Sequence, residues 1–457
     1  MHLIDSLKQS NNDIRILWFS VFIRMTSYGL TNQVLTLYLE ELGVSQQNIG
    51  VFMTLTLVGD TIISYFLTWY ADRIGRRVVM IIGTVMMFVS GLTFTFSSHF
   101  ILLLIAATIG VISPSGDETG PFKSVEEASI AHLTPDNHRP EVFAFYGLFA
   151  TVGAAVGSLS CGLLVDYLNL QLNYDIETCY RAVFLIYSII GVLKFISMLF
   201  LSQKCEVNHA RRDSFNLLSQ EVDGNDSTEE DQIDEEDEQE DDEDAIEGVS
   251  FNFTGLSPTT RYYLPRLLII FMLDSFGYGF MPSAWIIYYL KKTFQITASG
   301  LGTLFFITNS IDSITTLPSA WLAKLLGPVK AILFTQAPSA VIFFLIAYVS
   351  KFPIVAILLV LYYSVSTMDI VPRQILLTSI MPQDEITKVM GIVNIGKTFA
   401  RCIGPVFTGR LAANQLLYVG FIINGVCTLV ADIILGLNFL HLDQEILEKQ
   451  SVVVNIE

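Results

Sequence analysis

The sequence predicts an all-α membrane protein with twelve transmembrane helices in two pseudo-symmetric six-helix bundles. Three observations lead to this fold class: a composition too apolar for a soluble protein, twelve apolar windows of membrane-crossing length, and an internal repeat. Of the 457 residues, 52% are hydrophobic and 15% are charged, whereas a soluble domain usually carries about 25% charged residues. Composition therefore indicates a membrane protein before any motif is considered.

The twelve spans come from windows of roughly 20 apolar residues, which cover ~30 Å of hydrocarbon at ~1.5 Å per residue. They run approximately over residues 14–39, 49–69, 78–96, 101–132, 142–168, 182–201, 262–290, 301–322, 329–349, 353–380, 386–412 and 416–440. The polar segment 1–12 lacks the basic region, short apolar run and cleavage site of a signal peptide. We therefore expect the first helix to remain in the mature protein.

A highly charged segment divides the chain into halves. The expected organisation is an N-terminal bundle over 1–201, a disordered acidic linker over 202–260, a C-terminal bundle over 261–441 and a short tail over 442–457. The formal net charge is -18, but eighteen of the 44 acidic residues lie between Asp213 and Glu247, and no Lys or Arg falls between Arg212 and Arg261. The rest of the chain is neutral, so the charge describes one solvated segment and gives no reason to expect nucleic acid as a partner.

The two halves repeat one another. A shift of 247 residues places Pro135 on Pro382, Val142 on Val389, Gly157 on Gly404 and Gly162 on Gly409, and a shift of 252 places Asp60 on Asp312, Ala71 on Ala323 and Gly75 on Gly327. These matches fall in order on the same helix numbers, so each half is expected to be a copy of one six-helix unit.

Basic residues between the spans predict the orientation. Arg73, Arg76 and Arg77 lie between spans two and three, and Lys324 and Lys330 lie at the equivalent place in the second half. Basic loops favour the cytosolic side, so the termini and the acidic linker are expected to face the cytosol. The plasma membrane and a vacuolar or other internal membrane are both open as the place of residence.

One loop carries a family resemblance. Residues 71–77 read Ala-Asp-Arg-Ile-Gly-Arg-Arg, which resembles the G-x-L-A-D-R-x-G-R-R motif of the major facilitator superfamily. The sequence departs from that motif at Thr68 and Tyr70. The resemblance implies the twelve-helix fold of that superfamily and the transport of a small solute.

The resemblance also implies a latch at this loop. Asp72 would lie against the start of a second-half helix, span eleven, where the positive end of the helix dipole favours an anion. The remaining motif residues, Arg73, Gly75, Arg76 and Arg77, would fix the same cytosolic seam. The simpler alternative is that the arginines only set the topology.

Small residues on spans five and eleven resemble the glycine-rich helices of the same family. They are Gly153, Gly157 and Gly162 on span five, and Gly404, Pro405 and Gly409 on span eleven. Small residues let membrane helices approach closely. The antiporter form of this motif has Gly-Pro on span five, whereas here Ser158 stands at the proline, which leaves the direction of transport open; plain helix packing is the alternative role.

Ionisable residues inside the predicted spans form the expected solute and proton pathway. An ionisable side chain at mid-bilayer costs ~2.5 to 3.5 kcal/mol, so it must face protein or water. Arg24, Asp60, Asp274, Asp312 and Arg401 are expected roughly 15 to 25 Å from the nearer helix end. Arg24 and Asp60 could instead form a purely structural pair. Asp274 and Asp312 have no base at comparable depth in spans seven and eight, so we expect unpaired carboxylates that can hold a proton.

Span four is interrupted by two prolines and two glycines around Asp117 and Glu118. Irregular backbone at membrane depth is tolerated where it lines a cavity or packs on protein, so both acids join the expected pathway. Lys123 precedes Glu126 and Glu127 by three and four residues, and this spacing predicts partial neutralisation on one helical face.

The second half supplies bases at Arg373, Lys397 and Arg401. Lys397 and Arg401 are one helical turn apart and would repel each other on an isolated helix, so a common anionic partner is expected. That partner is either the acidic cluster of span four or the solute. An acidic wall facing a basic wall would suit a zwitterion or an organic anion.

No enzyme motif is present in the sequence: it contains no HExxH, GxSxG or phosphate loop, its six histidines do not cluster, and its five cysteines lack metal-ligand spacing. We therefore expect no catalytic residue, metal or cofactor. The expected function is alternating-access transport of a small solute, proton-coupled, with efflux favoured over uptake, by a monomer in a lipid bilayer.

Two alternatives stay open: a non-transporting nutrient sensor on the same fold, and a facilitative carrier of a sugar or organic anion. A sugar porter would carry Pro-Glu-Ser-Pro-Arg after span six, and residues 201–205 read Leu-Ser-Gln-Lys-Cys instead.

Overall fold

A computed structural model describes residues 11–110, 112–113, 121–134, 138–206, 257–382, 385–444 and 446–447 of the chain. The acidic linker, apart from its two ends, therefore lies outside the described residues.

The first half consists of helices joined by short turns. They are α2 (Asn12–Glu41), α3 (Gln46–Ile74), α4 (Arg76–Phe96), α5 (Phe100–Ile109), α6 (Pro121–Leu133), α7 (Arg139–Asp166) continued by a π-helical turn (Tyr167–Gln171), α8 (Ile176–Leu199) and a 3-10 turn (Gln203–Cys205). Predicted span four corresponds to α5 and α6 together.

The second half repeats this order. Its helices are α10 (Pro258–Phe280), α11 (Ser283–Phe294), α12 (Ala298–Leu326), α13 (Pro328–Ile346), α14 (Phe352–Ser366), α15 (Ile370–Ile380), α16 (Ile386–Ala413) and α17 (Tyr418–Phe439). Span seven divides into α10 and α11 next to Pro282, which has no backbone N–H to continue a helix. Span ten divides into α14 and α15.

Capping side chains explain where several helices begin. Ser45 accepts a hydrogen bond from the Asn48 amide at the start of α3, and Thr297 accepts one from Gly300 at the start of α12. An N-cap side chain satisfies an amide that has no partner inside the helix. These two caps are related by the larger of the two repeat shifts, the one that also places Asp60 on Asp312.

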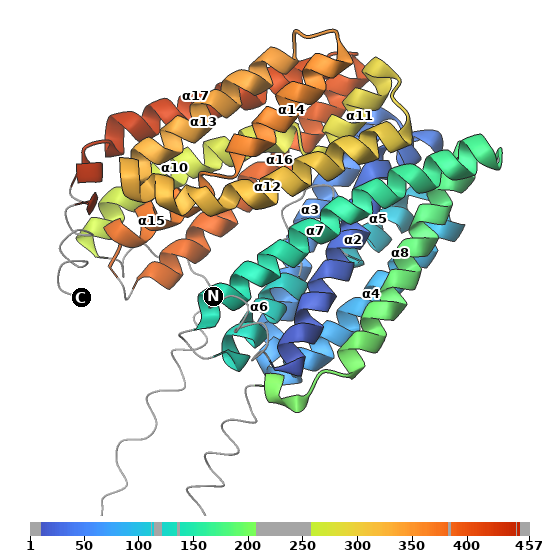
Figure 1. Cartoon of the computed structure of the whole chain (residues 1–457), viewed down its shortest axis with the longest axis horizontal. Helices are drawn as coiled ribbons and strands as arrows, with labels where there is room; N and C mark the ends of the chain where they lie inside the picture. Colours follow the sequence, from blue (N-terminus) through green and yellow to red (C-terminus); the bar gives the residue numbers. More distant parts are fainter. Residues whose placement is uncertain are drawn as a thin grey trace, which may run out of the picture.

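The two halves are joined along a seam of three helix pairs. Helix α7 lies along α12, α3 lies along α16, and α2 contacts α11. The halves converge at the end that contains α11 and the C-terminal part of α7, and they diverge towards the end that contains α6 and α15 (Figure 1). We call the first the closed end and the second the open end.

Close backbone contacts in the seam obey the predicted repeat. A Cβ on Gly50 of α3 would lie 2.4 Å from the Pro405 carbonyl oxygen of α16, and a Cβ on Gly302 of α12 would lie 2.6 Å from the Ser158 carbonyl oxygen of α7. The larger repeat shift relates Gly302 to Gly50, and the smaller one relates Pro405 to Ser158. The repeat predicted from the sequence is therefore confirmed in three dimensions.

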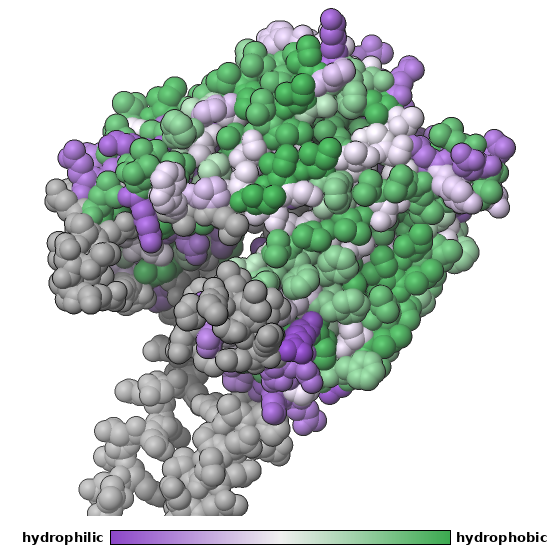
Figure 2. Space-filling view, viewed as in Figure 1, coloured by the Kyte–Doolittle hydropathy of each residue, from purple (hydrophilic) through white to green (hydrophobic). Residues whose placement is uncertain are grey.

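The outer surface is that of a membrane protein. Apolar residues cover much of the face in Figure 2, and large side chains such as Leu437 and Phe96 are strongly exposed. Among the described residues, eight helical stretches are long and apolar enough to cross a membrane by length and composition. The four other predicted spans correspond to α2, α5 with α6, α12 and α16. Helices α2, α12 and α16 carry residues of the predicted pathway, and the span of α5 and α6 is interrupted, so none of the four meets this criterion.

Candidate functional site

A buried ion cluster ties three helices of the first half together around Glu126 of α6. The Glu126 side chain is fully buried; its Oε2 lies 3.1 Å from Arg24 Nη2 of α2 and its Oε1 lies 3.2 Å from Lys194 Nζ of α8. The hydroxyls of Ser20 and Tyr146 donate to the same carboxylate at 2.7 and 2.8 Å. Four donors thus compensate one anion, as burial requires.

This cluster corrects two predictions. Among the described residues, the carboxylate that contacts Arg24 is Glu126 rather than Asp60, so the alternative of a structural Arg24–Asp60 pair is wrong. Glu126 takes Arg24 and Lys194 as partners rather than Lys123, so the neutralisation predicted within one helix is also wrong for this residue. In both cases the bundle brings together helices that are distant in sequence, and helical spacing alone could not reveal the partners.

Lys194 itself was missing from the predicted pathway. Its side chain is fully buried, and its Nζ lies 3.5 Å from the centre of the Phe122 ring of α6. A cation over an aromatic face is stabilised by the ring quadrupole. The sequence did contain a signal for it, since Lys194 is a single lysine inside an otherwise apolar span, and a charge at that depth requires a partner.

The second half contains a corresponding cluster with Arg373 of α15 at its centre. Arg373 Nη2 lies 2.8 Å from Asp274 Oδ2 of α10, and Arg373 Nε lies 2.5 Å from Asp369 Oδ2. The Gln336 amide of α13 donates to Asp369 at 3.0 Å, and the Thr428 hydroxyl of α17 donates to Asp274 Oδ1 at 3.1 Å. Arg373 and Asp274 remain 12% and 19% exposed, so the cluster is not fully closed off.

The cluster overturns the expectation that Asp274 is unpaired. Its base comes from α15, a helix outside the two that the prediction considered. The expected basic wall is wrong at Arg373 as well, because this arginine binds carboxylates of its own half. Asp369, the second carboxylate that contacts Arg373, was missed by sequence reasoning.

A third acid of the second half, Asp432 of α17, was also missed. Only 4% of Asp432 is exposed, and within the described part of the chain neither carboxylate oxygen has a hydrogen-bond partner. Asp274, Arg373 and Asp369 are the charged groups that act on it electrostatically. Asp432 is one helical turn beyond Thr428, on the same side of α17.

The other predicted pathway residues lie along the seam or outside the description. Asp60 of α3 is buried and accepts a bond from Ser64, and the guanidinium of Arg401 of α16 lies 4.9 Å from the centre of the Tyr278 ring. Asp312 of α12 precedes Ser313, whose hydroxyl is 2.9 Å from that of Thr151 on α7. Lys397 is partly buried on α16 and acts electrostatically on Asp369. Asp117 and Glu118 lie outside the described residues.

The described residues of the loop motif make their contacts within the first half. Gly75 adopts φ = 108°, and Glu206 accepts bonds from the Arg76 and Arg77 amides at 2.8 and 3.1 Å. Their guanidinium groups donate to the Ala128 and Leu199 carbonyls. These contacts place Arg76 and Arg77 against α6 and α8, and their role at the seam stays a prediction. The side chains of Asp72 and Arg73 lie outside the description, so the Asp72 latch stays a prediction.

The equivalent turn of the second half has the same construction. Gly327 adopts φ = 88°, and Asp443 accepts bonds from the Val329 and Lys330 amides at 2.8 and 2.9 Å. A carboxylate after the last helix of each half therefore caps the helix of the third predicted span of that half, α4 and α13. Glycine is favoured at both turns because these φ values strain other residues.

Polar side chains hold the closed end together. Lys292 Nζ of α11 lies 2.7 Å from Glu40 Oε2 of α2, and the Tyr288 hydroxyl donates to Glu40 Oε1 at 2.8 Å. Asp166 of α7 accepts bonds from the Ala298 and Ser299 amides at the start of α12, at 3.1 and 2.8 Å. An anion at a helix N-terminus also interacts favourably with the helix dipole.

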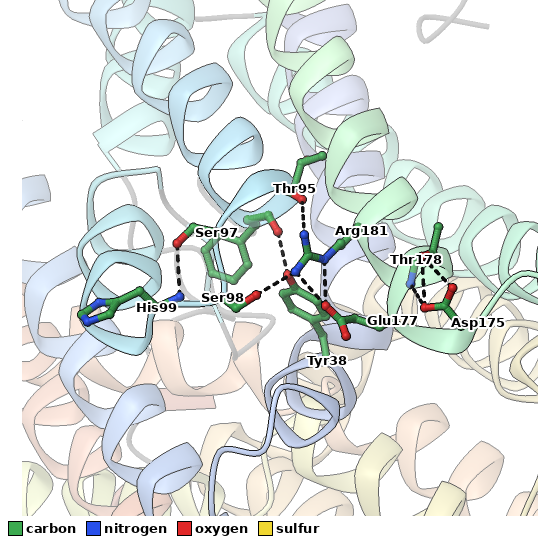
Figure 3. Close-up of polar contacts among 10 residues, drawn as sticks. Tyr38, Thr95, Ser97, Ser98, His99, Asp175, Glu177, Thr178 and Arg181 are labelled. Carbon is green, nitrogen blue, oxygen red and sulfur yellow. Dashed lines mark hydrogen bonds and ion pairs between the residues drawn. The ribbon is translucent and has the colours of Figure 1, made fainter.

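A second polar group stabilises the first half at the same end, as Figure 3 shows. Arg181 of α8 donates to Glu177 at 2.7 Å, to the Ser98 hydroxyl at 2.7 Å and to the Thr95 carbonyl at 3.2 Å. At the start of α8, the hydroxyl and then the amide of Thr178 hold the pKa of the Asp175 carboxyl below its ordinary value. This group joins α4 and α8 at the end where the halves meet.

The chain is similar over nearly its whole length to known transporters. The family model described as Major Facilitator Superfamily matches residues 17–224 and 267–452. An uncharacterized membrane protein of Saccharomyces cerevisiae is 46% identical over 444 residues, which cover 96% of each chain. The quinolone resistance protein NorA of Staphylococcus aureus is 25% identical over 186 residues, 41% of this chain and 44% of NorA.

Solved structures have the same fold. A bacterial homologue of the human lysosomal transporter Spinster has a TM-score of 0.68 at 12% identity, covering 93% of this chain and 96% of its own. The D-xylose-proton symporter has a TM-score of 0.66 at 16% identity, with coverages of 94% and 97%. Together with the family match, the two six-helix bundles and their shared seam establish that this chain belongs to the major facilitator superfamily of membrane transporters.

Proposed function

We propose that this carrier moves a small solute by alternating access and that proton movement drives the cycle. The observation that supports this most is the one-sided closure of the seam: glycine contacts and the Glu40–Lys292 pair join the halves at the closed end, while the halves diverge at the open end (Figure 1). Rocking of two similar bundles about a central site is the usual way in which such repeats alternate access.

The open end would give solute access to the space between the bundles. Arg24, Asp274 and Arg373 have 11%, 19% and 12% of their side chains exposed, from which we infer that they border that space. They are the residues on which we expect a polar solute to bind, together with Arg401, Lys397, Asp60 and Asp312 of the seam helices. Glu126 and Lys194 are fully buried, so their proposed role is to position Arg24.

The direction of transport and the orientation belong to the same proposal. We favour efflux by proton antiport, which the partial similarity to a quinolone resistance protein supports. The basic residues near the open end favour a cytosolic location for that end.

Transport is tested with purified protein in sealed liposomes that contain a pH-sensitive dye. A panel of cationic, anionic and zwitterionic compounds is first screened for thermal stabilisation of the protein, and the stabilising compounds are then tested for uptake with and without an imposed pH gradient. We expect solute flux that responds to the gradient and carries protons.

The control variant for these assays is Gly391→Ala, because a Cβ at this glycine meets no atom within 4 Å. A protein that binds a compound and moves none under any gradient would instead be a sensor. Flux that ignores the pH gradient would identify a facilitative carrier.

A further inference from the structure

The ion clusters of the two halves are related by the internal repeat with their charges reversed. Arg373 is 247 residues beyond Glu126, and Asp274 is 250 residues beyond Arg24. Backbone contacts support both alignments. In the first half, a Cβ on Gly29 would meet the Ala154 carbonyl oxygen at 2.3 Å. The shift of 250 takes Gly29 to Gly279 and the shift of 247 takes Ala154 to Arg401, and a Cβ on Gly279 would meet the Arg401 carbonyl oxygen at 2.4 Å. A base and an acid have thus exchanged places between the bundles.

The third member of each cluster is on the last helix of its half. Ser188 of α8 contacts the Phe88 carbonyl, and Gly425 of α17 lies against the Ala340 carbonyl. Ala340 is related to Phe88 by the larger repeat shift, so these contacts align Ser188 with Gly425. Carried along both helices, this alignment places Asp432 one position beyond the equivalent of Lys194. The first half carries base, acid and base, and the second half carries acid, base and acid.

The two clusters differ in how completely their charges are compensated. Every member of the first cluster contacts Glu126, which has four donors. In the second cluster, Arg373 binds Asp274 and Asp369, and Asp432 is left buried without a donor on either oxygen. An uncompensated carboxylate inside a membrane protein is costly, so it must be neutralised by a bound cation.

The charges around Asp432 amount to one missing positive charge. The groups concerned are Asp274 on α10, Asp369 just before α15, Arg373 on α15 and Lys397 on α16; the packed helix α13 contributes the uncharged Gln336. Counted over the described residues, three acids and two bases leave one negative charge in excess. Among the described residues, no group of three His, Cys, Asp or Glu side chains is arranged to hold a metal ion, and Arg373 already bridges two of the carboxylates, so a single proton fits this site.

We propose that Asp432 is the proton-binding group of this carrier, an inference that rests on the proposed proton-coupled function. With the proton bound, Arg373 is shared between Asp274 and Asp369. When the proton leaves, the third carboxylate competes for Arg373 and weakens its contact with Asp274, which borders the space between the bundles. Proton release and the charge presented to solute are thereby linked through Thr428 and Arg373, both within the same cluster.

The site can be tested without knowing the solute. Infrared difference spectra recorded between acidic and alkaline pH should show a protonated carboxylic acid in the wild type, and Asp432→Asn should lose that band. Asp175→Asn is the matched control, since Asp175 is an exposed helix cap and asparagine also caps helices; it should keep the band. A band that survives in Asp432→Asn, or that only Asp369→Asn removes, overturns the assignment.

A second measurement uses the unaltered protein. Dicyclohexylcarbodiimide reacts with protonated carboxylic acids in apolar surroundings, and peptide mass spectrometry locates the adduct. We expect Asp432 to be labelled, with less labelling as the pH rises. Labelling confined to other carboxylates, or protection of Asp432 by sodium at constant pH, contradicts the inference.

The transport assay separates this inference from the proposed function. With a solute identified in the panel, Asp432→Asn should lose pH-gradient-driven accumulation and keep solute exchange at equal pH. If the wild type shows no coupling, the proposed function fails whatever the spectra show. If the wild type is coupled and Asp432→Asn is coupled equally, the assignment to Asp432 alone fails.

Discussion

Lys194 of α8 and Glu126 of α6 are both fully buried, and Lys194 Nζ lies 3.2 Å from Glu126 Oε1. Removing one partner of a buried ion pair typically costs about 3 to 5 kcal/mol, because the other charge is left uncompensated. In this cluster, loss of Glu126 would leave Arg24 and Lys194 facing each other. The pair is therefore expected to stabilise the first bundle rather than to carry solute.

We expect Glu126→Gln to lower the melting temperature of the purified protein strongly. Ser20→Ala removes one of four donors to the same carboxylate and should cost less, about 1.5 to 3 kcal/mol. Thermal unfolding in detergent, followed by size-exclusion chromatography, measures both. A Glu126→Gln protein that melts with the wild type would mean that the cluster does not stabilise the fold.

The general architecture could be predicted from the sequence because its signals are local. Apolar windows located the spans, and the repeat shift paired Gly157 with Gly404. Ion partners are different, since they join helices far apart in the chain. The shift that aligned these glycines also relates Glu126 to Arg373. A repeat found from identical residues does not match two residues of opposite charge, so their relationship becomes evident only from the contacts in the two bundles.

Two acids of the candidate site show why the remainder was missed. Asp369 lies at the break between α14 and α15, where the prediction assumed one continuous span. Asp432 lies in an apolar stretch of the predicted span 416–440, and no neighbouring charge on that span marked it as part of a cluster. Each became significant only because α10, α15 and α17 converge.

A methyl group in the seam should prevent the closed end from forming. Gly50→Ala would place a Cβ 2.4 Å from the Pro405 carbonyl oxygen, and Gly302→Ala would place one 2.6 Å from that of Ser158. Neither oxygen can move without moving a helix. We expect both variants to fold and to lose transport, because only one state of the cycle is blocked.

Alkylation of Cys161 measures this opening directly. Cys161 is buried beside Gln33, Gly162 and Ala298, which belong to both sides of the seam. A thiol reagent should react faster with it in Gly50→Ala than in the wild type, and Gly391→Ala should leave the rate unchanged. Equal rates in all three proteins would show that the glycine contacts do not control the seam.

The capping carboxylate of α8 should give a defined acid dependence. The pKa of Asp175 is below its ordinary value of about 3.9, so its stabilising effect is present above that value and is lost as the pH falls through the lowered pKa. We expect Asp175→Ala to reduce stability by a constant amount at neutral pH. The difference from the wild type should shrink only in strong acid. Asp175→Asn should resemble the wild type at neutral pH and should not lose its cap in strong acid, because asparagine does not titrate. Thermal unfolding across pH tests this; a difference that already vanishes near neutrality would rule out the carboxylate as the cap.

The ion pair at the closed end should set how often that end opens. Lys292 and Glu40 are 51% and 24% exposed, and pairs of this kind contribute about 0.2 to 1 kcal/mol. Breaking the pair with Glu40→Lys should therefore raise the alkylation rate of Cys161 a few-fold. The exchanged double variant, Glu40→Lys with Lys292→Glu, should restore much of the original rate, although the Tyr288 hydroxyl bond to Glu40 is not recovered. High salt should speed alkylation in the wild type, where it screens an attraction, and slow it in Glu40→Lys, where it screens the repulsion between two lysines. If the exchanged variant reacted as fast as Glu40→Lys alone, the attraction between these two side chains would not be what holds α2 against α11.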